Sequence, residues 1–165
     1  MTGQRITTAR LVLEPLAVAH AEEMAAVLDD PALHTFTGGE PASPGALRER
    51  YARLVAGPPP ERDEAWLNWV LRRRDDQRLV GTVQATVTSA GTRAAIAWVV
   101  GTPWQGRGYA TEAALGMASW LRAGGVNDVV ATIHPEHAAS AAVARRLGLE
   151  PTAERVDGEV LWRAP

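Results

Sequence analysis

The chain has 165 residues, a formal net charge of −2 and no cysteine, which excludes disulfides, thiolate metal sites and an acyl-cysteine intermediate. The small net charge argues against a broad nucleic-acid-binding surface, and no apolar run reaches the roughly 18 residues that span a bilayer. Because the N-terminus also lacks a signal-peptide pattern, we expect one cytoplasmic domain over residues 1–165 that contacts neither nucleic acid nor membrane.

The first 56 residues predict one strand and two helices. Residues 10–16 alternate as a strand does, and residues 18–28 repeat apolar side chains with a helical period. Residues 35–40 contain two adjacent glycines and predict a flexible loop. Ser43 precedes a proline, which is typical of a helix N-cap followed by a first-turn proline, so we expect a helix over residues 44–55.

Three extended runs follow, over residues 65–73, 78–88 and 93–100. Turn sequences separate them at residues 75–76 and 90–91. Short turns between strands favour antiparallel neighbours, so these runs predict a meander.

The last third alternates between helix and strand. Residues 109–123 predict a helix with a stripe of small side chains that ends at two glycines, and residues 128–133 predict a short buried strand. A helix over residues 138–147 and a hairpin with its turn at residues 156–159 complete the chain. This order of elements predicts a mixed α/β fold.

A loop with two glycines leaves the strand at residues 93–100 and opens the helix at residue 109. Glycine lets backbone approach a ligand closely, and the first turn of a helix offers unpaired N–H groups and a positive dipole end. The loop therefore predicts a phosphate-binding site. A Walker loop is excluded because the chain has no lysine, and a dinucleotide-binding loop would need a third glycine. A plain strand-to-helix turn is the alternative.

The spacing Gln105-x-x-Gly108-x-Ala110 resembles the acetyl-CoA-binding motif of the GNAT acetyltransferase superfamily, and its surroundings look most like the RimJ/RimL-type branch. His137-x-x-Ser140, followed by Leu147-Gly148, is similar to that family's Asn-x-x-Ser helix. The resemblance implies a mostly antiparallel sheet of about six or seven strands with about four helices, split in a V between the fourth and fifth strands. It also implies an acetyl-CoA site without a metal, at residues Trp98, Val99, Val100, Gln105, Gly106, Arg107, Gly108, Tyr109, Ala110, Thr111, His137 and Ser140.

In that family the backbone of the strand before the loop forms hydrogen bonds with the thioester oxygen and with the pantetheine amides. We assign this role to Val99 and Val100. The strand carboxylate that often acts as base in the related branch is missing here. We expect Ser140 either to donate a proton to the departing thiolate or to cap its helix. His134 is the candidate base, with a water relay to a backbone carbonyl as the alternative.

The resemblance implies an N-acetyltransferase that transfers acetyl directly from acetyl-CoA to a primary amine in a ternary complex. The acceptor is expected to be a small molecule or a protein N-terminus. A homodimer is one possible oligomeric state. We expect the acceptor site to include His34, Phe36, Asn68 and Gln84. Two other readings stay open, a non-catalytic acyl-CoA-binding module and a nucleotide-binding regulator.

Overall fold

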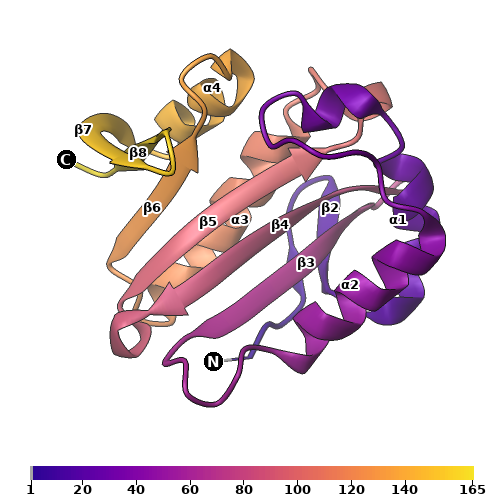
Figure 1. Ribbon diagram of the computed structural model, residues 1–165, viewed down its shortest axis with the longest axis horizontal. Coiled ribbons are helices and arrows are strands. Elements are labelled where there is room, and N and C mark those ends of the chain that lie inside the picture. Colours follow the sequence, from indigo (N-terminus) through magenta and orange to yellow (C-terminus); the bar gives the residue numbers. More distant parts are fainter. Residues whose placement is uncertain (1) are drawn as a thin grey trace.

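An eight-stranded sheet forms the centre of the computed structural model, which describes residues 2–165 except for the side chain of Ser89 (Figure 1). The strands are β1 (Ile6–Thr7), β2 (Leu11–Pro15), β3 (Ala65–Arg73), β4 (Leu79–Thr88), β5 (Arg93–Val100), β6 (Asp128–Ile133), β7 (Glu150–Val156) and β8 (Glu159–Arg163). They lie in the order β1-β2-β3-β4-β5-β6-β8-β7, and every neighbouring pair is antiparallel except β5 and β6, which are parallel.

The described helices cover both faces of this sheet (Figure 1). They are α1 (Ala21–Val27), α2 (Pro44–Ala56), α3 (Tyr109–Ala123) and α4 (Ala138–Arg146), with short 3-10 turns η1 to η4 between elements. Side chains of α1 and α2 form one apolar cluster with β3 and β4. A larger cluster joins α3 and α4 to the other face of the sheet, including residues of β3 and β4. No helix within residues 2–165 is long and apolar enough to cross a membrane.

The mixed α/β fold with a mostly antiparallel sheet is confirmed, and the strand count is eight because the sequence analysis missed β1. β1 has only two residues, Ile6 and Thr7, which is too short for an alternation to show. The predicted N-cap is also confirmed, since the Ala46 N–H donates to Ser43 Oγ at 3.1 Å.

Two glycines allow close approaches between elements. A Cβ on Gly81 in β4 would overlap the carbonyl oxygen of Val99 in β5. A Cβ on Gly116 would lie 2.9 Å from Thr8 Cγ2, so the missing side chain lets α3 rest on the segment between β1 and β2.

The sheet splits between β5 and β6, as the resemblance implied. Parallel pairing joins only Arg93 to Asp128, Ala94 to Val129 and Ala95 to Val130. Beyond these pairs the two strands diverge, which is visible as a V in Figure 1. Residues 96–100 of β5 therefore have no strand partner on the side of β6.

Candidate functional site

The open edge of β5 offers backbone groups to the split. The Gly101 N–H donates to Val80 O in β4 at 2.8 Å. Since backbone groups alternate in direction along a strand, the N–H and C=O of Val99 also turn toward β4, whereas those of Trp98 and Val100 turn toward the split. Of the two valines assigned a backbone role, only Val100 presents its amide to the opening.

The loop after β5 combines left-handed glycines with open space. Gly106 has a φ of 76° and Gly108 a φ of 83°, conformations that favour glycine. No protein atom lies within 4 Å of where a Gly106 Cβ would stand. The Gln105 side-chain amide donates to Val100 O at 3.0 Å and so ties the loop to the end of β5. The space beside Gly106 fits a ligand held by the first turn of α3.

A cluster of hydrogen bonds holds the start of α3 in place. Glu112 accepts from Thr8 Oγ1 at 2.6 Å, from the Arg10 N–H at 2.8 Å and from Arg10 Nε at 2.7 Å. Arg10 Nη1 also donates to Arg107 O in the loop at 2.9 Å, and its guanidinium lies 4.4 Å from the ring centre of buried Tyr109. Burial alone would raise the pKa of Glu112, but the hydrogen bonds from Thr8 and Arg10 outweigh it and lower this pKa.

Four further residues that were predicted for the acetyl-CoA site lie in the same region. The side chain of Arg107 is exposed, Ala110 and Thr111 follow Tyr109 in the first turn of α3, and Trp98 is partly buried at the split. The loop, the helix start and the open edge of β5 are therefore neighbours in one region, as the resemblance implied. Sequence analysis missed Arg10 and Glu112 as partners, because 102 residues separate them; the acidic residue in the first turn of a helix was the only local signal.

A second group gathers at the N-terminus of α4. His137 Nε2 lies 3.3 Å from Ser140 Oγ, and the Phe36 ring stacks on His137 with 4.5 Å between ring centres. Burial, aided by the charge of His134, lowers the pKa of His137 against an opposing effect of Glu159. The Ser140 hydroxyl pairs with His137 here, and no side-chain cap is seen at this helix start.

His134 lies beside the same phenylalanine, with 4.9 Å between the ring centres of Phe36 and His134. The Glu136 N–H donates to His134 Nδ1 at 3.1 Å. A neutral ring that accepts at Nδ1 carries its proton on Nε2. A neutral His134 with this hydrogen bond would present an N–H at Nε2, and its role as the base stays a prediction.

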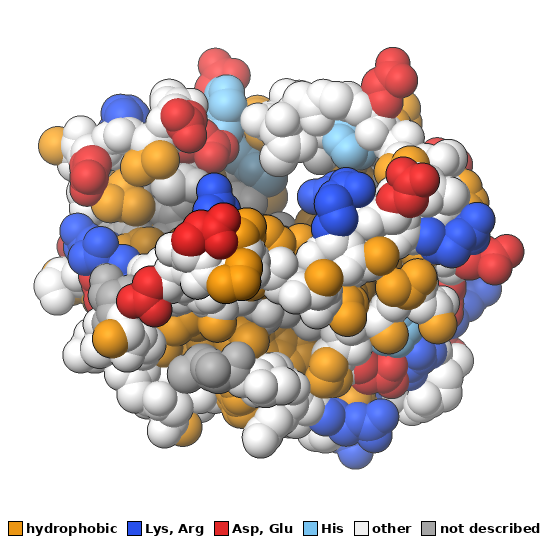
Figure 2. Space-filling model, turned by 60° about the horizontal axis from the view of Figure 1, so that its bottom comes forward, with side chains coloured by type: hydrophobic (Ala, Val, Ile, Leu, Met, Phe, Trp, Pro, Cys, Tyr) orange, Lys and Arg blue, Asp and Glu red, His pale blue; other side chains and the backbone are white. Residues whose placement is uncertain are grey.

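A cavity of about 530 Å³ lies between the sheet and the segments that carry α1 and α2. It brings together His34, Asn68, Gln84, Trp98 and Val99, which the sequence analysis placed in two different sites. Figure 2 shows a hollow on this molecule with basic, acidic and histidine side chains around its rim.

The floor of this cavity is polar. Asn68 in β3 stands directly opposite Gln84 in β4, so their side chains share one face of the sheet. Thr82 is two residues from Gln84 and faces the same way, so a search at the strand period would have found it. His34 is held at the rim, with its Nδ1 3.3 Å from Gly38 O.

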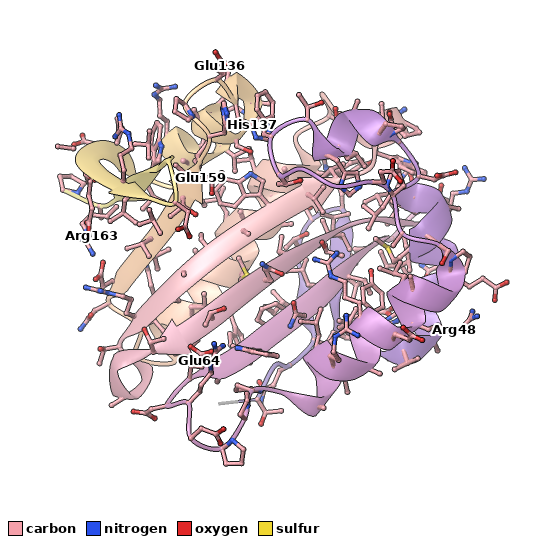
Figure 3. All side chains as sticks on the ribbon, viewed as in Figure 1. Arg48, Glu64, Glu136, His137, Glu159 and Arg163 are labelled. Carbon is pink, nitrogen blue, oxygen red and sulfur yellow. The ribbon has the colours of Figure 1, made fainter. Side chains whose placement is uncertain are left out.

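A second cavity, of about 450 Å³, is lined by Phe36, Thr37, His134, Asp157, Gly158 and Glu159. Thr37 also lines the first cavity, so the loop over residues 35–40 borders both. In Figure 3, Glu159 at the start of β8 lies close to the split, below His137. Sequence analysis did not single out Glu159, because nothing local in a hairpin shows that it lines a cavity with Phe36 and His134.

Comparisons with known proteins agree with this geometry. The sequence model of the acetyltransferase (GNAT) domain matches residues 10–150. A comparison with curated protein sequences gives no match.

Solved structures share the fold at low sequence identity. An acetyltransferase from Agrobacterium tumefaciens is 24% identical, with a TM-score of 0.74 over 100% of this chain and 96% of its own. RimL, a ribosomal L7/L12 alpha-N-protein acetyltransferase in complex with coenzyme A, is 16% identical, with a TM-score of 0.78 over 97% of each chain. The microcin C7 self-immunity acetyltransferase MccE, in complex with acetyl-CoA and AMP, is 16% identical, with a TM-score of 0.76 over 94% of this chain and 92% of its own.

Proposed function

This chain belongs to the GNAT acetyltransferase family, and on that premise we propose that it transfers the acetyl group of acetyl-CoA directly to a primary amine. The observation that carries the proposal is the early end of the β5–β6 pairing, which exposes one backbone edge of β5 immediately before the glycine loop. An open strand edge that leads into a helix N-terminus offers donors both to an amide-containing arm and to a phosphate.

The residues that would hold the cosubstrate follow from this geometry. The first-turn N–H groups of α3 and the loop at Gly106 and Gly108 would bind the pyrophosphate. The backbone of Trp98 and Val100 would bond the pantetheine arm and the thioester oxygen. His137 and Ser140 would lie near the sulfur, from the opposite side of the split.

Acetyl-CoA supplies an activated thioester, and the protein aligns it with the amine. The amine nitrogen forms the new bond to the acetyl carbon, the carbon–sulfur bond breaks, and sulfur leaves with the electron pair. Ser140 would donate a proton to this sulfur and would regain one from solvent, which restores the hydroxyl. Three carboxylates line the two cavities, Glu40 in the first and Asp157 and Glu159 in the second. Of these, Glu40 or Glu159 would attract the ammonium form of the acceptor and take up its proton.

The test compares two glycine variants at positions that both have a positive φ. Gly106→Glu places a negative side chain in the proposed phosphate site. Gly125→Glu places the same side chain beyond the other end of α3, away from that site. Both glycines have positive φ, 76° and 104°, and neither has a protein atom within 4 Å of its would-be Cβ.

We expect acetyl-CoA to raise the melting temperature of the wild type and of Gly125→Glu, but not of folded Gly106→Glu. Thiol release with a panel of primary amines should show the same pattern. An equal thermal shift in both variants would refute the loop assignment. Stabilisation by acetyl-CoA without thiol release from any amine would instead favour the non-catalytic acyl-CoA-binding module.

A further inference from the structure

The 530 Å³ cavity is lined by polar side chains that have no protein partner. Within residues 2–165, no side-chain hydrogen bond or ion pair involves Arg50, Tyr51, Asn68, Thr82 or Gln84. Buried or half-buried polar groups in proteins are normally paired. Of these five, Tyr51 is buried and Asn68 and Thr82 are half-buried, so these three indicate a ligand with polar groups of its own, whereas Arg50 and Gln84 are exposed to solvent.

The most deeply buried of these groups is the Tyr51 hydroxyl. The Tyr51 side chain is only 4% exposed, it lines the cavity, and its hydroxyl has no hydrogen-bond partner. A buried hydroxyl without a partner is unfavourable, and a ligand that hydrogen-bonds to it would remove this cost. The hydroxyl oxygen itself has almost no accessible surface, so a ligand would pair with it only after a shift of the side chains around it.

The next residue of α2, Arg50, adds a positive charge at the same place. Arg50 is exposed at the edge of the cavity, and its charge is close enough to oppose the rise that burial causes in the pKa of Tyr51. Among the described lining residues Arg50 is the one arginine and Glu40 the one carboxylate. A guanidinium beside a hydroxyl is suited to a carboxylate, which accepts from both.

The remaining walls are apolar. The residues that contribute them include Leu16, Leu28, Leu33, Leu47 and Leu54. A space of this size, apolar with a few polar groups, is typical of small-molecule sites. It matches a compact ligand that carries one apolar group.

Resting on the proposed function, we propose that the acceptor is a free α-amino acid with a bulky apolar side chain. Its carboxylate would bind Arg50 and Tyr51, and Glu40 would attract its ammonium group. Asn68, Thr82 and Gln84 on the sheet would orient the amine toward the open end of β5. A protein N-terminus has an amide where a free amino acid has its carboxylate, so it would leave Arg50 unpaired.

The experiment measures kcat/KM for L-phenylalanine, its amide, 2-phenylethylamine and a peptide with N-terminal phenylalanine. We expect L-phenylalanine to exceed each of the others by about tenfold or more, which is the effect of one charge-assisted contact. In Arg50→Gln the ratio between L-phenylalanine and 2-phenylethylamine should fall by about the same factor. Tyr51→Phe should reduce this ratio as well.

The matched control is Arg48→Gln. Arg48 is an exposed arginine on the same helix, absent from the lining of the cavity, and it points outward in Figure 3. This variant should keep the wild-type ratio. Calorimetric titration of L-phenylalanine and its amide into the CoA-saturated protein repeats the comparison without turnover, and there too Arg50→Gln should remove the preference.

Equal kcat/KM values for L-phenylalanine and 2-phenylethylamine would overturn the proposal, and so would a ratio between them that is unchanged in Arg50→Gln. Acetylation of the peptide alone would also overturn it while the acetyltransferase function stands. If the protein neither binds acetyl-CoA nor releases thiol, the proposed acetyltransferase function itself is wrong. This outcome differs from those above, which contradict only the proposed acceptor.

Discussion

At the scale of single residues, the pair His137–Ser140 distinguishes this chain from the family pattern, which has asparagine at the first position. His137 Nε2 lies 3.3 Å from Ser140 Oγ, so among the described residues the imidazole is the hydrogen-bond partner of the hydroxyl. When the imidazole donates to the Ser140 oxygen, the single hydroxyl hydrogen is free to point at another acceptor. In that tautomer His137 would act as a positioning residue for the proton that we propose Ser140 gives to sulfur.

Ser140→Ala removes this proton donor without disturbing the glycine loop. We expect kcat to fall by about a hundredfold to ten-thousandfold, the range for a positioned acid, while the dissociation constant of acetyl-CoA changes little. Steady-state kinetics and calorimetry would measure the two quantities. A lower melting temperature with unchanged kcat would instead assign Ser140 a structural role in α4.

His137 should also make stability depend on pH. Burial and the neighbouring His134 hold its pKa in the folded state below the ordinary value of about 6.5, so the unfolded chain binds the proton more readily. The contribution to stability is therefore complete above about pH 6.5 and is lost as the pH falls below it.

His137→Asn should therefore lose less unfolding free energy than the wild type between about pH 7 and pH 5. Urea denaturation at several pH values would measure this difference. Parallel pH profiles for the two proteins would show that the charged form of His137 is not disfavoured in the fold.

At the scale of elements, local sequence was sufficient where a local physical signal exists. The bounds predicted for β3, β5, α3 and β6 are those of the structure. The start of α2 followed from a serine whose oxygen accepts a backbone N–H, and its end from Gly57, which adopts a φ of 85°. Turns and caps are formed by residues that are close together in the sequence, so the sequence alone can predict them.

Contacts between distant elements left no such signal. The hydrogen bonds from Thr8 and Arg10 to Glu112 join residues more than 100 positions apart, and the stacking of Phe36 on His137 joins a loop to α4. Nothing in residues 35–40 alone indicates this contact. The glycine loop could therefore be proposed as the acetyl-CoA site from its spacing, whereas Glu159, Arg50 and Tyr51 needed the assembled sheet to be found as candidates.

At the scale of the whole molecule, the split sheet joins two parts through a short seam. One part contains β1 to β5, and the other contains β6, β8 and β7 with α4 (Figure 1). The seam is the three residue pairs between β5 and β6, reinforced by an ion pair of 2.7 Å between Arg93 and Asp128 at its closed end. Acetyl-CoA, bound as proposed, would contact both parts across the open end.

This arrangement predicts where a bound ligand should slow amide hydrogen exchange. Protein segments with few packed neighbours open more readily than the core, and a ligand that bridges them raises the cost of opening. With acetyl-CoA we expect slower exchange at Trp98 and Val100, in the first turn of α3 and at the start of α4. The three paired residues of β5 at the closed end, 93–95, should change least and provide an internal reference. The Gly106→Glu variant should show none of this protection. Protection confined to α3, with β5 and α4 unchanged, would mean that the ligand binds the helix N-terminus without spanning the split, and the roles proposed for Val100 and Ser140 would then be wrong.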